Sequence, residues 1–158
     1  INKKMVLTQT FNYGAATVIN EKARELVCRC WPSVEDLPHD LWIGIISLWF
    51  GQIYYVDEEL YYWIRYDNSV TGEGTKMSGI KYRIKKSISK KSYPNVAKFL
   101  LDNYFSYLSK EDIEFLERVT NYKTSIISLI KLISDKDFKR ASLKGTIALK
   151  WGILMKWF

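Results

Sequence analysis

The sequence predicts an α/β domain followed by a helical extension, and three observations support this. Residues 4–11 include a short strand-like stretch, and residues 53–56 and 60–66 are rich in β-branched and aromatic residues on either side of an acidic turn. Before that turn lies an apolar run with helical spacing, which ends at Gly51. Beyond Pro94 the apolar residues recur at the spacing of helices.

Four helix starts can be predicted from capping residues. Asn20 is predicted to cap a helix that continues to Cys30. Asp40 is predicted to cap a second helix, which is apolar nearly all round and should therefore be buried. The boxes SKED (109–112) and SDKD (134–137) predict the starts of two later helices. The second helix carries its apolar residues at Leu41, Trp42, Ile45, Ile46, Trp49 and Phe50.

Charge divides the chain into parts. The 158 residues carry a net charge of +7, and 47% of them are hydrophobic, which favours a globular protein. Residues 1–73 hold six basic and ten acidic side chains, residues 74–101 hold eight basic and no acidic ones, and residues 119–158 hold eight and two. We therefore predict a domain at 1–73 and a basic flexible linker at 74–92, followed by helices over 93–158.

Several functional classes are disfavoured by composition. His39 is the one histidine, and the two cysteines are Cys28 and Cys30, so an all-protein zinc site or a disulfide framework is not expected. This cysteine usage fits a reducing compartment. The apolar stretch 41–56 is interrupted at Gly51 and falls short of the roughly 20 residues of a membrane-spanning helix. The aromatic residues do not alternate with the basic cluster, so no nucleic acid partner is expected.

Three segments form a recognisable series. They read GAATVIN (14–20), PHDLW (38–42), and GQIYYVDEEL (51–60) running into WIRYDNSVTG (63–72). In this order and spacing they resemble the second half of bacterial family 2 glycosyltransferases of the rhamnosyltransferase-like kind. That family has a small-residue segment ending in Asn, then His-Asp-Trp-Trp, then a Gly-x-Ile strand and a Tyr-Arg-x-His-x-x-Asn segment. Leu41 here replaces the first Trp.

The resemblance implies a partial nucleotide-sugar glycosyltransferase fold of the GT-A type. It also implies an inverting enzyme that moves a sugar from a nucleoside diphosphate sugar to a hydroxyl of a surface polysaccharide or lipid-linked glycan. The general base of the family is the Asp of the His-Asp motif, which is Asp40 here; it would take the proton of the acceptor hydroxyl. An Asp before an apolar helix is also an ordinary N-cap, and both roles can coexist.

The acceptor site implied by the resemblance has structural alternatives. His39 could equally be a hydrogen-bonding residue, and Trp42 could pack in the core. Asn20 is explained nearly as well as a helix cap. The small residues at 14–16 would permit close approach of the backbone to a sugar. The implied acceptor-binding residues are His39, Trp42, Thr17 and Asn20.

The implied donor site departs from the family at two positions. Arg65 and Asn68 are its candidates for the diphosphate, but Ile64 stands at the Arg position and Tyr66 at the His position expected near the metal. Tyrosine is a poor metal ligand at neutral pH, so the metal ligands are unknown. The resemblance implies Mg²⁺ or Mn²⁺, bound mostly by an upstream nucleotide-binding half. We therefore expect this chain to be part of a longer enzyme, inactive alone and without ordinary affinity for nucleotide sugars.

Two regions suggest contact with a membrane. The basic segment 76–91 is either a solvated linker or attracts a diphosphate-bearing acceptor or anionic lipid. The C-terminal helix either lies in a membrane interface or packs on the catalytic domain or a second subunit, so a homo-oligomer stays open. We expect a cytoplasmic protein, peripheral at the inner face of the membrane; the rival is a non-catalytic binding or membrane-docking module. The C-terminal stripe comprises Leu143, Ile147, Trp151, Leu154 and Phe158.

Overall fold

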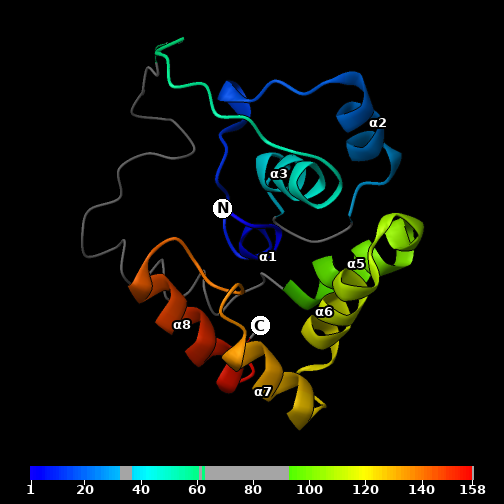
Figure 1. Cartoon of the computed structure of the whole chain (residues 1–158), viewed down its shortest axis with the longest axis vertical. Coiled ribbons are helices and arrows are strands. Elements are labelled where there is room, and N and C mark those ends of the chain that lie inside the picture. The colour runs from blue at the N-terminus through cyan, green and yellow to red at the C-terminus, as the bar shows by residue number, and fades with distance from the viewer. Residues whose placement is uncertain (33–36, 61, 63–92, 158) are drawn as a thin grey trace.

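The computed structural model describes residues 1–32, 37–60, 62 and 93–157. Every regular element within these residues is a helix (Figure 1). In chain order the elements are α1 (Lys3–Val6), η1 (Gly14–Ala16), α2 (Glu21–Arg29), α3 (His39–Phe50), α5 (Tyr93–Tyr104), η2 (Phe105–Tyr107), α6 (Lys110–Asn121), α7 (Ile126–Ser134) and α8 (Leu143–Leu154), where η denotes a 3-10 turn.

The predicted α/β architecture, and with it the partial GT-A fold, is wrong: the described residues contain helices and no strand. The stretch 4–11 lies partly in α1. This helix forms because the Asn2 side chain accepts hydrogen bonds from the backbone N–H groups of Lys4 and Met5, at 3.0 and 2.9 Å. These local bonds satisfy the helix start without any partner strand.

The predicted strand pair is not formed by its described residues. Residues 53–56, Leu60 and Tyr62 are exposed and have no regular secondary structure. A β-branched and aromatic composition favours a strand only where a neighbouring strand supplies the ladder of hydrogen bonds and the packing. Residues 61 and 63–66 of this prediction lie outside the described residues.

Three predicted helices are confirmed. The side chain of Asn20 accepts a hydrogen bond from Ala23 N at 2.9 Å and so caps α2. The side chain of Ser109 accepts one from Asp112 N at 3.2 Å and caps α6. The apolar run becomes α3, although it begins one residue before Asp40 and has Pro38 at its N-cap.

The box SDKD was interpreted wrongly. Ser134 ends α7, and the carboxylate of Asp135 accepts hydrogen bonds from the backbone N–H groups of Asp137 and Phe138, at 2.9 and 3.2 Å. Such a local turn competes with helix formation, because the side chain offers the backbone another set of partners. The last helix begins later, at Leu143.

Helix α3 lies at the centre of the hydrophobic core. The ring of Trp42 meets Phe99 of α5 edge-on at 5.6 Å between centroids, and the ring of Trp49 stacks on Phe115 of α6 at 6.2 Å. Helices α1 and α2 pack on α3 from other sides. The parts predicted as 1–73 and 93–158 therefore share one core where they are described, and 74–92 lies outside the description.

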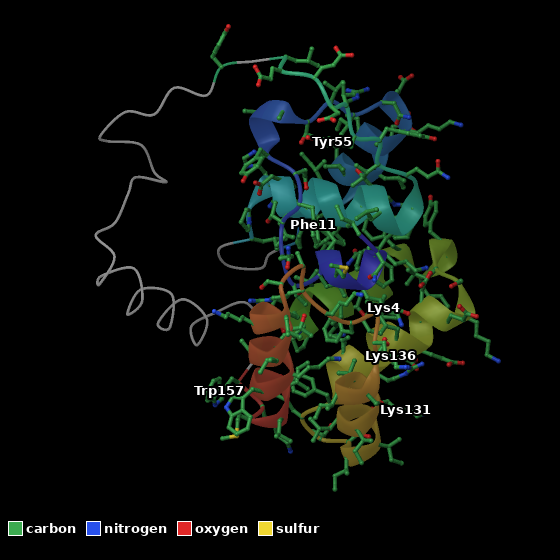
Figure 2. The ribbon with its side chains drawn as sticks, turned by 60° about the vertical axis from the view of Figure 1, so that its left-hand side comes forward. Lys4, Phe11, Tyr55, Lys131, Lys136 and Trp157 are labelled. Carbon is green, nitrogen blue, oxygen red and sulfur yellow. The ribbon has the colours of Figure 1, made fainter. Side chains whose placement is uncertain are left out.

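Helices α7 and α8 form an antiparallel pair at the end of the molecule opposite α2 and α3 (Figures 1 and 2). Two lysines of the C-terminal segment fix α8 on α7. Lys150 Nζ donates to the carbonyl oxygens of Leu132 and Asp135, at 2.6 and 2.8 Å. Lys156 Nζ donates to the carbonyl oxygen of Lys123, at 2.7 Å, near the start of α7.

Candidate functional site

The candidate site lies at the first turn of α3, which presents His39 and Asp40. Asp40 is the second residue of the helix, and its Oδ1 accepts a hydrogen bond from Leu41 N at 2.8 Å. The Asp40 residue is partly exposed, and His39 is exposed. The rest of α3 is anchored in the core. A carboxylate is thus held at the surface by a helix that cannot easily move.

Gly14 brings the segment 12–17 against this helix start. A Cβ atom added at Gly14 would overlap Nε2 of His39, so a residue with a side chain would have to displace the imidazole. Two of the three segments of the family resemblance, GAATVIN and PHDLW, therefore meet in space at Gly14 and His39. The small residue is needed here for close approach and not for an unusual backbone angle, since no described glycine has positive φ.

Asn12 fixes the approach of the two segments, and the sequence analysis missed it. Its Nδ2 donates to the carbonyl oxygen of Asp40 at 3.0 Å and to Thr17 Oγ1 at 3.3 Å. The hydroxyl of Thr17 in turn donates to the carbonyl oxygen of Tyr13 at 2.6 Å. A loop asparagine next to an aromatic residue carries no motif, so only the fold reveals this role.

Gly44 makes room for the same asparagine. A Cβ at Gly44 would lie 2.6 Å from Oδ1 of Asn12, so a residue with a side chain would have to displace the Asn12 amide. Glycine in a helix costs about 1 kcal/mol relative to alanine. Here the missing side chain of Gly44 leaves room for Asn12 to lie against α3 one turn after Asp40. The buried Oδ1 of Asn12 has no hydrogen-bond partner within the part of the chain that is described.

Trp42 lies in the core and away from the surface. Its side chain is fully buried, its Nε1 donates to the carbonyl oxygen of Val27 at 3.2 Å, and its ring also meets Tyr104 edge-on. In this structure the ring is therefore closed to an acceptor sugar. Trp42 therefore packs in the core, which was one of its two predicted roles. Its other predicted role, binding an acceptor, would need an exposed ring surface that Trp42 does not have.

The remaining predicted site residues that the structure describes are Asn20 and Thr17. The side chain of Asn20 is engaged at the start of α2, where it caps that helix. Arg65, Tyr66 and Asn68 lie outside the described residues, so the predicted donor and metal contacts stay predictions. Thr17 joins the site only through its hydrogen bond with Asn12.

The described residues by themselves offer no site for a divalent metal, and the expected Mg²⁺ or Mn²⁺, placed mostly in an upstream half, stays a prediction. Among residues 1–32, 37–60, 62 and 93–157, no three or more His, Cys, Asp or Glu side chains lie close enough together to hold an ion. His39 and Asp40 are adjacent but lack a third ligand of this kind. We therefore derive no chemical step through a metal.

A second cluster of charged groups lies between α1 and the α7–α8 pair. Lys4 Nζ donates to Asp135 Oδ2 at 2.7 Å. Burial raises the pKa of Asp135, but the hydrogen bonds from Lys4 and from two backbone N–H groups outweigh it, so the pKa lies below its ordinary value. Burial is also the main reason why the pKa of Lys150 is lowered. This cluster joins α1 to the α7–α8 pair, and Lys150 Nζ is engaged there by two carbonyl oxygens.

No family model, curated protein or solved structure matches this chain.

Proposed function

We propose that this chain forms the acceptor side of an inverting glycosyltransferase, with Asp40 as the general base. The observation that carries the proposal is the meeting of the segments 12–17 and 38–42 at the start of α3, where Asp40 is partly exposed beside His39. Residues 14–17 and 38–42 belong to two of the segments, GAATVIN (14–20) and PHDLW (38–42), on which the family resemblance rests. Because the α/β fold that the resemblance implied is not found among the described residues, the proposal rests on this local arrangement and on the sequence motifs alone.

The proposed reaction needs one proton transfer from the acceptor. The hydroxyl oxygen of the acceptor glycan attacks the anomeric carbon of a nucleoside diphosphate sugar. The bond from that carbon to the diphosphate oxygen breaks, and the nucleoside diphosphate leaves with the electron pair. The carboxylate of Asp40 takes the hydroxyl proton, which requires that the hydroxyl come within hydrogen-bond reach of it. His39, exposed beside it, would orient the acceptor.

The test is Asp40→Asn in the protein expressed from its complete reading frame. Asparagine keeps the oxygen that accepts from Leu41 N, so the helix start should survive. Loss of a general base lowers a rate typically by 10²- to 10⁴-fold, and we expect a loss of about 100-fold or more in sugar transfer to a soluble glycan acceptor. Glu111→Gln is the matched control, since Glu111 is the second residue of α6, as Asp40 is of α3, and its side chain is exposed.

Three outcomes would count against the proposal. Retained turnover in Asp40→Asn would remove Asp40 from the role of base. An equal loss in Glu111→Gln would mean that charge at a helix start, and not proton transfer, explains the effect. If the unaltered protein shows no transfer with any nucleotide sugar, the rival interpretation as a non-catalytic binding module gains support.

We further propose that the protein contacts a membrane peripherally, at its cytoplasmic face. None of the described helices is long and apolar enough to cross a bilayer. The support for contact is the exposure of apolar side chains on the C-terminal helix, among them Leu143 and Trp151. A glycan acceptor carried on a lipid would be reached from such a position.

A further inference from the structure

Helix α8 has apolar side chains on both of its faces. Leu149, Gly152 and Ile153 are buried against the core. The opposite face carries Leu143, Ile147, Trp151 and Leu154, which are 77%, 60%, 53% and 48% exposed. These four recur at intervals of three and four residues, so they share one side of the helix. A helix that is apolar all round normally has both sides covered.

Helix α7 repeats the arrangement. Its Leu132 is buried, whereas Ile126, Ile127 and Ile130 are 72%, 68% and 60% exposed. Single exposed apolar residues are common on protein surfaces, but a concentration of large ones on two neighbouring helices marks an interaction site. The hydrogen bonds of Lys150 and Lys156 hold the two helices together, so both outer faces belong to one unit.

The charge around these faces is strongly positive. Residues 119–158 contain eight basic and two acidic side chains, and one of the acidic ones, Asp135, is paired with Lys4. Figure 2 shows Lys131 on α7, Lys136 in the following turn and Trp157 projecting beside α8. Trp157 is 47% exposed. The exposed lysines of this region are Lys123, Lys131, Lys136, Lys139, Lys144 and Lys156.

We infer that the outer faces of α7 and α8 form the membrane-binding surface of the protein, and that it binds anionic lipid. This rests on the peripheral contact proposed above and assigns it to named residues. Isoleucine, leucine and tryptophan side chains would enter the boundary between headgroups and acyl chains, and lysines would meet the lipid phosphates. A second copy of the chain fits less well, because the contact would bring two strongly positive surfaces together.

The experiment measures flotation of the 158-residue chain with lipid vesicles. One set contains equal parts of phosphatidylglycerol and phosphatidylcholine, and the other contains phosphatidylcholine alone. We expect stronger partition to the anionic set, with a gap that narrows as salt is raised. Ile147→Asp should lower the partition about tenfold or more, because it removes an exposed apolar side chain that would enter the lipid and adds a negative charge that anionic lipid repels.

Val18→Asp is the matched control. Val18 is also β-branched, is 98% exposed, and lies between η1 and α2 at the other end of the molecule. The same change of charge there should leave partition within about twofold if the membrane contacts α7 and α8. Lys144→Gln should reduce binding about fivefold, and only to the anionic vesicles, because one lysine near such a surface contributes about that factor. Circular dichroism of each variant checks that the helices persist.

The results separate the inference from the proposals on which it rests. If the chain floats but Ile147→Asp and Val18→Asp behave alike, membrane contact stands and this surface is excluded. If the chain floats with neither vesicle, both the contact and the surface are excluded, while sugar transfer to a soluble acceptor is unaffected. If ultracentrifugation instead shows a dimer that Ile147→Asp dissociates, without flotation, the faces bind a second copy and the inference is overturned.

Discussion

Helices α3 and α8 are alike in length and both rich in large apolar residues, but they differ in burial. Each is twelve residues long and carries apolar side chains on more than one side. In α3, six residues are buried, including Trp42 and Trp49; in α8, three are buried, and Trp151 is half exposed. The difference shows that the composition of a helix indicates how much apolar surface it has, but not what covers that surface.

The neighbours of the two helices explain the contrast. Helix α3 is enclosed by α1, α2 and the rings of α5 and α6. Helix α8 packs on α7, and its Ile153 lines a small apolar gap with Tyr93 and Val119, so the described part of the chain covers only one of its sides. Enclosure makes α3 a rigid support for His39 and Asp40 at its first turn. The open side of α8 is available for a partner.

The largest expected effect compares one tryptophan in each helix. Trp42→Ala should reduce the free energy of unfolding by about 3–5 kcal/mol, because it opens a cavity in the core and leaves the carbonyl oxygen of Val27 without its donor. Trp151→Ala should cost less than about 1 kcal/mol, since half of its side chain is already in water. Urea unfolding followed by circular dichroism measures both values.

Trp42→Phe keeps this comparison usable if Trp42→Ala does not fold. It retains most of the ring and removes the hydrogen bond to Val27, so its cost should fall between those of the two alanine variants. Equal losses for Trp42→Ala and Trp151→Ala would contradict the contrast. That result would mean that the outer face of α8 is covered in solution by the protein itself.

Sequence patterns predicted those elements whose determinants are local. The caps of Asn20 and Ser109 each bond a backbone N–H three residues ahead, and both were found from sequence. The apolar run of α3 was also found, because its period needs no partner. The prediction of a helix start that included Asp135 was wrong. The Asp135 carboxylate instead forms a turn with the backbone that follows it, and Lys4, 131 residues away in the sequence, stabilises that carboxylate.

The strand predictions failed for the same physical reason. A strand needs a partner strand, and the sequence of residues 53–56 cannot say whether one is present. At the candidate site, the family resemblance rested on residues 14–20 and 38–42 without predicting that they touch, and the close approach of Gly14 to His39 comes from the structure. Asn12, whose hydrogen bond joins the two segments, has no sequence signal, since its role depends on the space at Gly44.

A smaller effect tests the link between the two regions. Lys4 of α1, which packs on α3, pairs with Asp135 in the turn that follows α7. Asp135→Asn removes the charge but keeps an oxygen for the backbone N–H groups of Asp137 and Phe138. We expect a loss of about 1.5 kcal/mol in the free energy of unfolding at pH 7.

The same pair makes stability depend on pH in the acid range. The pKa of Asp135 is lowered in the folded protein from an ordinary value of 3.8, so the unfolded chain binds more protons at low pH. Its stabilisation is complete above about pH 5 and is lost as the pH falls through the folded pKa. Asp135→Asn should flatten this part of the curve. Asp102→Asn, which breaks an exposed pair with Lys98, should leave it nearly unchanged.

The smallest expected effect concerns the N-terminal caps, which are alike in the region around α3 and in the region around α8. Asn20 caps α2, which packs on α3, and Ser142 caps α8; each side chain accepts one hydrogen bond, from Ala23 N and Gly145 N. A cap acts within the first turn of its helix. Asn20→Ala and Ser142→Ala should therefore each lower the free energy of unfolding by about 1 kcal/mol, however deeply the rest of the helix is buried. Asn20→Asp should restore the stability, as a carboxylate caps equally well.

If Asn20→Ala leaves the unfolding curve unchanged but weakens glycan binding, Asn20 would serve the acceptor rather than the helix. Equal costs at both caps would instead locate the whole difference between α3 and α8 in tertiary packing.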